Sequence, residues 1–279
     1  MDTRPDSSPL PRPDEHIVAV VGAFGSGKSE VTVNLALALT AAGRRVTLVD
    51  LDLVNPYFRS REARMLLESA GVRVIVPPGD QAWADLPIVV PEVFGALNPG
   101  AGETTLLDVG GDDVGARVLG GMRTALAAAK AGLWQVVNER RPFTSTLEGC
   151  VRMQISLERS ARVPVTGIVS NAHLIDETTA DVVLGGLALA RTFGAERGIP
   201  VRCVAVRGEL AHAAAIRDCG VPVLRLERRM LPPWAHGAIP VDERSLAKNE
   251  QPLPADERPA PAARTVPLGL RHGGFRNLN

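Results

Sequence analysis

The chain has 279 residues, its 31 lysines and arginines are balanced by 31 aspartates and glutamates, and 45% of its residues are apolar. This length and composition are typical of one large globular domain or two small ones. Zero net charge argues against general binding to nucleic acid or to an anionic membrane. No apolar run approaches the roughly 20 residues that span a bilayer, and the first residues lack the layout of a secretion signal, so we expect a cytoplasmic protein.

The cysteines are three singletons, Cys150, Cys203 and Cys219. They form no CxC or CxxC pair and no metal-ligand spacing, which argues against a disulfide scaffold, a zinc ribbon or a cysteine-rich cluster site. We expect small buried thiols in a reducing compartment.

Proline recurs at both ends of the chain. The prolines are Pro5, Pro9, Pro11 and Pro13 before the first apolar run, and Pro252, Pro254, Pro259, Pro261 and Pro267 towards the C-terminus. Segments of this kind bury too little apolar surface to offset the entropy of becoming ordered. We therefore expect a flexible segment over residues 1–15, a folded domain over 16–245 and a flexible Pro-rich tail over 246–279.

Between these ends, short apolar runs alternate with longer segments of helical period. The runs are apolar at consecutive positions, which predicts strands that are covered on both faces. The predicted strands are Ile17–Val21, Val46–Asp50, Val72–Val76, Thr104–Val109, Leu133–Asn138, Val165–Ser170, Val201–Val206 and Val221–Leu226. The predicted helices are Lys28–Ala42, Arg61–Ala70, Gly115–Ala131, Thr144–Ser160, Asp176–Arg197 and Glu209–Cys219. This alternation indicates an α/β fold with a single doubly wound, mainly parallel sheet, helices on both faces, and ligands beyond the carboxyl ends of the strands.

A phosphate-binding loop directly follows the first predicted strand. Its residues are Gly22, Ala23, Phe24, Gly25, Ser26, Gly27, Lys28 and Ser29, which match the pattern G-x4-G-K-[ST] and open a predicted helix. Glycines let backbone N–H groups turn towards the phosphates, and the start of the helix adds positive potential. We expect Lys28 to reach the outer phosphates and the Ser29 hydroxyl to bind Mg²⁺.

Acidic residues lie at the ends of two predicted strands. Asp50 ends the second and Asp108 lies near the end of the fourth. A carboxylate in this position is desolvated unless it meets a cation, so a metal site explains both residues, with helix capping or a solvated loop end as the alternative. Asp52 lies two residues beyond Asp50, on the same side of an extended chain, where it can orient the attacking water. We predict Lys28, Asp52 and Asp108 as catalytic residues, and Ser29, Asp50 and Asp108 as metal ligands.

Two further segments are expected near the terminal phosphate. Gly110 and Gly111 follow Asp108 and would let the backbone pass close to the phosphate and move with it, as switch loops do. The segment Pro56–Arg59 contains the only tyrosine and follows the second strand. Its aromatic residues either clamp a partner or substrate, or anchor the loop on the core.

These motifs resemble the SIMIBI class of P-loop NTPases, in particular the MinD/ParA/CobQ-type ATP-binding domain. The resemblance covers about residues 16–226 and rests on the phosphate loop, the acidic ends of two strands and Asn171 after a later strand. It implies a fold that binds Mg·ATP, in which Asp52 assists hydrolysis and two subunits close over the nucleotide. The segments 52–62 and 138–144 look like those of a bacterial branch of this class known only as ATP-binding proteins.

One position departs from this family. MinD and ParA proteins carry a signature lysine in the pattern K-G-G-x-G-K-[ST], and this chain has Ala23 in its place. That lysine enters the partner subunit's site, so a homodimer of the usual kind needs another cation here. The candidates are Arg59, Arg61, Arg140 and Arg141.

The strand-end sequence Ser170–Leu174 favours ATP over GTP. Guanine recognition in this superfamily usually uses N-K-x-D, and here Asn171 is followed by alanine, histidine and leucine. We expect Asn171 to hydrogen-bond the base, with a turn or cap residue as the alternative. The resemblance also places a residue from 226–229 at the adenine.

We therefore expect a Mg-dependent ATP-binding protein, an ATPase that works as a nucleotide-driven switch on an unknown protein partner. The alternative is a SIMIBI-fold kinase or ATP-dependent synthetase with a small-molecule acceptor, which the alanine at position 23 favours. An iron–sulfur carrier ATPase would need a cysteine pair at a subunit face. The glycines and proline of residues 264–275 oppose an amphipathic membrane helix, and the small basic cluster at 225–229 gives little support for binding nucleic acid.

Overall fold

The computed structural model describes residues 10–52, 64–76, 91–111 and 113–229. The chain divides into two units, residues 1–231 and 232–279. The boundary that we predicted at residue 245 and the Pro-rich tail lie outside the described residues, so both stay predictions.

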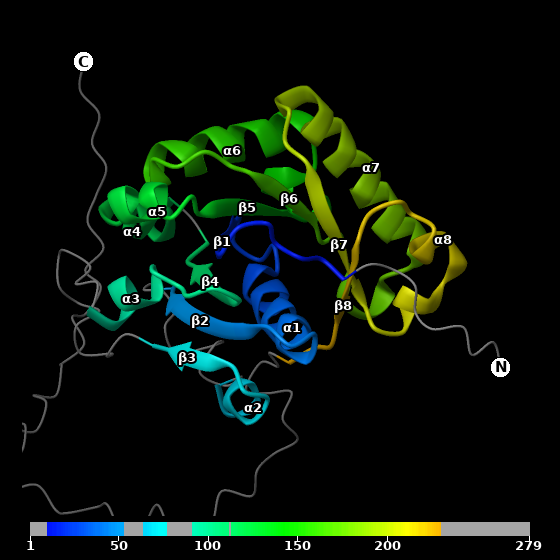
Figure 1. The fold of residues 1–279 in the computed structure, drawn as a ribbon. Coiled ribbons are helices and arrows are strands. Elements are labelled where there is room, and N and C mark those ends of the chain that lie inside the picture. Colours follow the sequence, from blue (N-terminus) through cyan, green and yellow to red (C-terminus); the bar gives the residue numbers. More distant parts are fainter. Residues whose placement is uncertain (1–9, 53–63, 77–90, 112, 230–279) are drawn as a thin grey trace, which may run out of the picture. The chain divides into compact units, whose positions relative to one another are not determined.

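Eight strands form one sheet, in which every neighbouring pair is parallel (Figure 1). They are β1 (Ile17–Gly22), β2 (Arg45–Leu51), β3 (Arg73–Ile75), β4 (Glu103–Val109), β5 (Gly132–Val137), β6 (Gly167–Ser170), β7 (Val201–Arg207) and β8 (Val223–Leu226). All eight correspond to predicted apolar runs. The strand order is β3-β2-β4-β1-β5-β6-β7-β8. Strand β1 therefore lies between a half built from β2 to β4 and a half built from β5 to β8, and its carboxyl end lies at the switch point.

The helices are α1 (Lys28–Ala41), α2 (Arg64–Ser69), α3 (Pro91–Ala96), α4 (Asp113–Gly121), α5 (Arg123–Ala128), α6 (Leu147–Ala161), α7 (Ala180–Arg197) and α8 (Ala214–Arg217). The described residues also include the 3₁₀ turns η2 (Pro142–Thr144), η3 (Ile175–Glu177) and η4 (Leu210–His212). None of the described helices combines the length and the apolar character that a membrane crossing requires.

The helices differ from the prediction in three regions. Residues 209–219, predicted as one helix, form the 3₁₀ turn η4 and the short helix α8. The region 115–131, predicted as one helix, is divided into α4 and α5 at Met122. The glycine pair before the break allows a close approach to α6, because a Cβ atom on Gly120 would lie 2.8 Å from the Ser160 carbonyl oxygen. Helix α3 was not predicted, since its six residues are too few to show a helical period.

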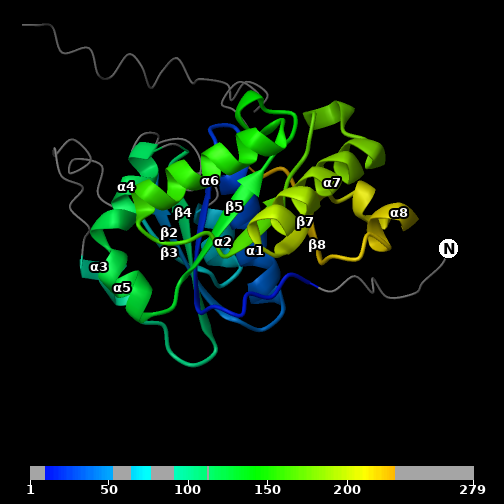
Figure 2. The ribbon, with the colours of Figure 1, turned by 90° about the horizontal axis from the view of Figure 1, so that it is seen from above.

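Helices cover both faces of the sheet (Figures 1 and 2). Alternate residues of β1 serve the two faces: Val18 and Val20 pack with residues of α1 and α2, whereas Ile17, Ala19 and Val21 pack with residues of α3 to α7. All six positions of β1 are buried. The predicted doubly wound α/β fold is therefore confirmed, and all the strands are parallel.

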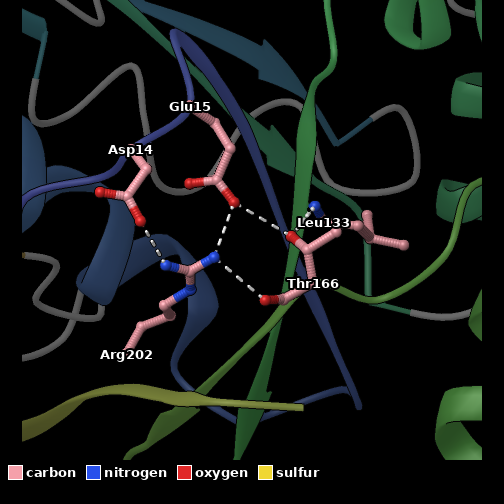
Figure 3. A network of polar contacts seen from close by, with 5 residues as sticks. All are labelled: Asp14, Glu15, Leu133, Thr166 and Arg202. Carbon is pink, nitrogen blue, oxygen red and sulfur yellow. Dashed lines mark hydrogen bonds and ion pairs between the residues drawn. The ribbon is translucent and has the colours of Figure 1, made fainter. Parts of the chain in front are cut away.

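The amino ends of the strands hold a polar network that ties down residues 14 and 15 (Figure 3). Arg202 lies 3.0 Å from carboxylate oxygens of both Asp14 and Glu15, and its guanidinium stands 5.6 Å from the centre of the Trp134 ring. Arg202 also donates to the backbone carbonyl of Thr166. Residues 14 and 15, which we predicted as part of a flexible segment, are thus attached to the sheet because their carboxylates neutralise a partly buried arginine.

Candidate functional site

The phosphate loop connects β1 to α1 through glycines in the left-handed region. Gly25 has φ of 72° and Gly27, the N-cap of α1, has φ of 85°. The Ser26 N–H donates to the Ala23 carbonyl over 3.1 Å, which closes the turn. This turn is the local geometry that the glycine spacing predicts, and it leads directly into the first turn of a helix.

Asn171 anchors the loop from the end of β6. Its Nδ2 donates to the Ser26 carbonyl over 2.8 Å, and its backbone N–H donates to the Val137 carbonyl of β5. A Cβ atom on Gly27 would lie only 2.4 Å from Asn171 Nδ2. Asn171 therefore positions the phosphate loop, and its predicted contact with the base stays a prediction.

The end of β4 lies against the lysine of the loop. A Cβ atom on Gly111 would be 2.5 Å from Lys28 Nζ and 3.1 Å from the Cα atom of Phe24. Only a residue without a side chain fits there while Lys28 keeps its position. The structure thus brings the predicted phosphate-binding lysine and the predicted switch glycine together, although they are far apart in the sequence.

Asp50 and Asp108 are directly opposite each other on the neighbouring strands β2 and β4. Both side chains are buried, as is Ser29 at the start of α1. Asp52 follows in close reach: its backbone N–H donates to Asp50 Oδ1 over 3.1 Å, and its Oδ1 lies 3.1 Å from the position of a Cβ on Gly110. All the acidic residues that we singled out therefore gather at the carboxyl ends of β2 and β4.

The donor set of this cluster fits magnesium. No three His, Cys, Asp or Glu side chains among the described residues form a metal-binding group of their own. Mg²⁺ typically takes one or two carboxylates and completes its octahedron with water and substrate phosphates. Ser29, Asp50 and Asp108 offer a hydroxyl and two carboxylates of this kind, so they suit Mg²⁺ bound with a nucleotide, and their role as ligands stays a prediction.

The loop after β5 contributes residues whose roles the sequence pattern did not assign. Asn138 is fully buried at the end of this strand. Its carbonyl oxygen accepts from the Arg141 N–H over 3.0 Å and from the Thr144 hydroxyl over 2.7 Å, and its Oδ1 accepts from the Arg140 N–H over 3.0 Å. The only signal in the sequence is a polar residue directly after the apolar run, which does not distinguish a loop organiser from a solvated strand end.

His173 lies close to the phosphate loop, within 3.6 Å of the position of a Cβ on Gly27. Burial lowers the pKa of His173 below its ordinary 6.5, and the positive charges of Arg141 and Arg228 lower it further. This residue, which we had not assigned a role, therefore reports a positive electrostatic potential at the loop.

The three cysteines are buried in three different apolar clusters of the core. Burial raises the pKa of Cys150 to about 11 and that of Cys203 to about 12. As we predicted, they are buried thiols, and they are not paired with one another.

Comparisons with known proteins agree with the phosphate loop. Residues 14–66 match the family model ParA, described as NUBPL iron-transfer P-loop NTPase. The cytosolic Fe-S cluster assembly factor CFD1 of Yarrowia lipolytica is 39% identical over 74 residues. The match covers 25% of this chain and only a quarter of that relative's own length.

Among solved structures, the cell division protein FtsY of Thermotoga maritima has a TM-score of 0.48 at 26% identity, over 74% of this chain and 66% of that one. A nucleotide-binding protein of Archaeoglobus fulgidus, in complex with ADP, has a TM-score of 0.40 at 18% identity, over 73% of this chain and 88% of that one. Because both scores are below 0.5, the fold class rests on this chain's own sheet and loop. With the ParA match over residues 14–66, they show a P-loop NTPase fold that resembles the SIMIBI class.

Proposed function

We propose that the chain binds Mg·ATP and hydrolyses it as a nucleotide-driven switch that acts on a protein partner. The observation that supports this most directly is the position of the Gly110–Gly111 segment. It lies between the Lys28 ammonium, which would hold a terminal phosphate, and the Asp52 carboxylate, which would orient water. A backbone so close to both groups would move when the phosphate arrives or leaves, and a partner could read that movement.

The residues of the site have distinct roles in this proposal. Lys28 and the N–H groups of the loop bind the phosphates. Ser29, Asp50 and Asp108 would hold Mg²⁺, which neutralises phosphate charge when bound. Asp52 orients a water molecule for attack on the terminal phosphorus; the bond to the bridging oxygen breaks, and the products are ADP and inorganic phosphate.

ATP is the nucleotide that the base region supports. Position 172 is alanine and position 174 is leucine, so the lysine and the aspartate of the guanine motif are missing after Asn171. The chain beyond β8 is fixed on α1 at the same end of the site: Asn34 donates to the Glu227 carbonyl over 3.0 Å and accepts from its N–H over 2.9 Å. Residues 227–229 are thus held in a defined place near the loop, where they could contact the base.

The relative from Yarrowia is named as an iron–sulfur cluster assembly factor. Each cysteine of this chain is buried in a core cluster of its own, so the chain lacks the exposed pair that would hold a cluster between two copies. A partner that carries its own ligands remains compatible with the switch function.

A kinase or synthetase for a small-molecule acceptor is the second candidate. The observation that favours it is Ala23, which is apolar and 1% exposed at the position of the signature lysine. Without that cation, a site that closes by pairing of two subunits in the usual way has lost one of its parts. An enzyme that transfers the phosphate to an acceptor would not need it.

Nucleotide binding is tested first. Isothermal titration of the full chain with Mg·ATP should give saturable binding that Lys28→Ala abolishes, because the outer phosphates lose their cation. Lys130→Ala is the matched control, since this lysine is exposed on the loop after α5 and should leave binding unchanged. Full retention of binding in Lys28→Ala would overturn the assignment of the phosphate loop.

The hydrolysis rate per chain, measured with Mg·ATP and Mg·GTP, then separates the two candidates. A measurable rate that Asp52→Asn stops, with binding intact, supports the switch ATPase. A negligible rate despite tight binding, or an unchanged rate in Asp52→Asn, contradicts the proposed hydrolysis and moves the acceptor enzyme to first place.

A further inference from the structure

The phosphate loop lacks a cation at the position where its family carries one. Ala23 occupies that position and is buried. Of the four arginines that we considered as substitutes, Arg59 and Arg61 lie outside the described residues. Arg140 is neutralised by Glu139 at 2.8 Å, and 42% of its side chain is exposed. The fourth arginine has different surroundings.

The Arg141 guanidinium packs against the phosphate loop itself. Its Cζ and Nε atoms are both 3.6 Å from the position that a Cβ on Gly25 would occupy, which is ordinary van der Waals contact. The Nε atom is buried and has no hydrogen-bond partner among the described residues. Within the same residues, no carboxylate forms an ion pair with Arg141. The Nε–H group of Arg141 has therefore lost its water without gaining a hydrogen bond from the described residues. This costs free energy unless an anion binds there.

The backbone of Arg141 is fixed from both sides. Its N–H donates to the Asn138 carbonyl over 3.0 Å, and its own carbonyl accepts from the Thr144 N–H over 3.0 Å. The Thr144 hydroxyl closes the loop on the same Asn138 carbonyl at 2.7 Å. Because the backbone is already fixed, less conformational entropy is lost when the Arg141 side chain binds a ligand.

The surroundings of Arg141 are positively charged. The pKa of half-buried His173 is lowered by partial burial and by the charges of Arg141 and Arg228, which favours its neutral form. Asp50 and Asp108 belong to strands on the other side of β1, and the carboxylate of Glu139 pairs with Arg140. This side of the loop thus presents cations that a phosphate chain would neutralise.

We propose that Arg141 is a phosphate-contacting residue that acts in cis, on the nucleotide held by its own chain. It supplies, from the loop after β5, the positive charge that the phosphate loop lacks at Ala23. This inference rests on the proposed nucleotide binding and deepens it: one chain contains a complete set of cations for the phosphates. Arginines that stabilise phosphate charge raise hydrolysis rates by about 10³–10⁵-fold in related chemistry.

The first test compares neighbouring arginines of one loop. Arg141→Gln should weaken binding of Mg·ATP, measured by titration calorimetry, by about 10-fold or more, because a charge-assisted contact to phosphate is lost. It should also lower the hydrolysis rate of a chain that hydrolyses ATP. Arg140→Gln should change neither value, since it removes a solvent-exposed cation with its own partner. Equal affinities in the wild type and in Arg141→Gln would overturn the proposal.

A second test needs no nucleotide. The ring pKa of His173, followed by NMR, should rise in Arg141→Gln and stay unchanged in Arg140→Gln, because the charge of Arg141, and not that of Arg140, lowers the pKa of that imidazole. The expected rise confirms that Arg141 faces the loop and that the variant is folded. An unchanged pKa would place the guanidinium elsewhere and overturn the geometry.

A third test distinguishes cis from trans. Arg141→Gln chains, which keep Lys28, are mixed with Lys28→Ala chains, which keep Arg141. The mixture can regain ATP affinity only if Arg141 of one chain enters the phosphate site of another chain. We expect no restoration. A mixture that binds like the wild type would show that Arg141 acts between subunits and would overturn the cis assignment. Loss of the proposed function itself is separate, since it appears as absent ATP binding in the wild type.

Discussion

The two ends of the parallel sheet differ in the groups that surround their basic side chains. At the amino ends, Arg202 has carboxylate oxygens of Asp14 and Glu15 at 3.0 Å, and it also donates to a backbone carbonyl (Figure 3). At the carboxyl ends, Lys28 lies against Gly111 and Arg141 against Gly25. Arg202 at the amino ends meets opposite charge, whereas Lys28 and Arg141 at the carboxyl ends each lie against a glycine.

This difference separates a structural network from a binding site. A network that holds the chain together gains most when its charges are paired within the protein. A site for an anion must instead keep cations near open backbone, and glycine provides that space. The fold tolerates the second arrangement at the carboxyl ends, where the helix α1 also begins.

The largest expected effect comes from closing that space. Gly27→Ala puts a Cβ 2.4 Å from Asn171 Nδ2 at a residue with φ of 85°, so the loop and its anchor cannot both keep their positions. We expect affinity for Mg·ATP to fall by about 100-fold or more, measured by calorimetry; 100-fold corresponds to roughly 2.7 kcal/mol.

Gly43→Ala is a matched control for this variant. Gly43 has φ of 84° but no atom within 4 Å of the added Cβ. It should lower the free energy of unfolding by about 1 kcal/mol through backbone strain and leave ATP affinity unchanged. Similar affinities in the two variants would show that the contact with Asn171 does not control ATP binding.

Disruption of the polar network at the amino ends should lower the stability of the protein and leave its affinity for ATP unchanged. Arg202→Met removes the partner of Glu15, whose side chain is 13% exposed, and the contact with the Trp134 ring. We expect the free energy of unfolding, from urea denaturation, to fall by about 2–3 kcal/mol, at the lower end for a buried pair because water still reaches Arg202. ATP affinity should stay within twofold.

Arg207→Met is the control for that loss. Its partners Asp176 and Glu209 are about 80% exposed, so the ion pairs are screened and the cost should be below about 1 kcal/mol. If Arg202→Met instead weakened ATP binding strongly while the protein stayed folded, the separation between the two ends of the sheet would fail.

Most of the sheet could be predicted from the sequence, and the reason is burial. The central strands β1, β4, β5 and β6 are covered on both faces, so apolar residues follow one another, and runs such as Ile17–Val21 and Thr104–Val109 fall within strands of the structure. Local patterns do not carry the strand order, which depends on contacts between distant residues. They also miss α3, which begins at Pro91 and is too short for periodicity.

The site was predictable in its components and not in its contacts. The loop Gly22–Ser29 can be recognised from the sequence because phosphate binding requires a rare local spacing of glycines, lysine and serine. The register that places Asp50 opposite Asp108 is a property of the pairing of β2 with β4, and the approach of Arg141 to Gly25 depends on a loop that Asn138 organises. Such tertiary contacts leave no pattern in a single sequence.

A smaller loss of ATP affinity is expected at Gly111, where the flexible side chain of Lys28 can move away from an added Cβ. Gly111→Ala places a Cβ 2.5 Å from Lys28 Nζ, and the lysine can retreat by a rotamer change. We expect ATP affinity to fall by about 10-fold, which corresponds to roughly 1.4 kcal/mol, in the same calorimetric titration. Gly121→Ala, with no atom within 4 Å of its added Cβ, should bind as the wild type does. Unchanged affinity in Gly111→Ala would mean that the end of β4 yields more easily than Lys28.

The smallest effect concerns the pH dependence of stability at the carboxyl ends. Burial and the charges of Arg141 and Arg228 lower the pKa of His173 below 6.5, so the unfolded chain takes up a proton there before the folded chain does. The free energy of unfolding should therefore fall as pH decreases from about 6.5 towards the pKa of the folded state, and this term is fully present above 6.5. His173→Gln removes the titrating group, so its stability, from urea denaturation at pH 7.5 and 5.5, should change less than that of the wild type. An equal change in both proteins would assign the pH dependence to other groups, and His173 would then not report the positive potential that we attribute to the loop.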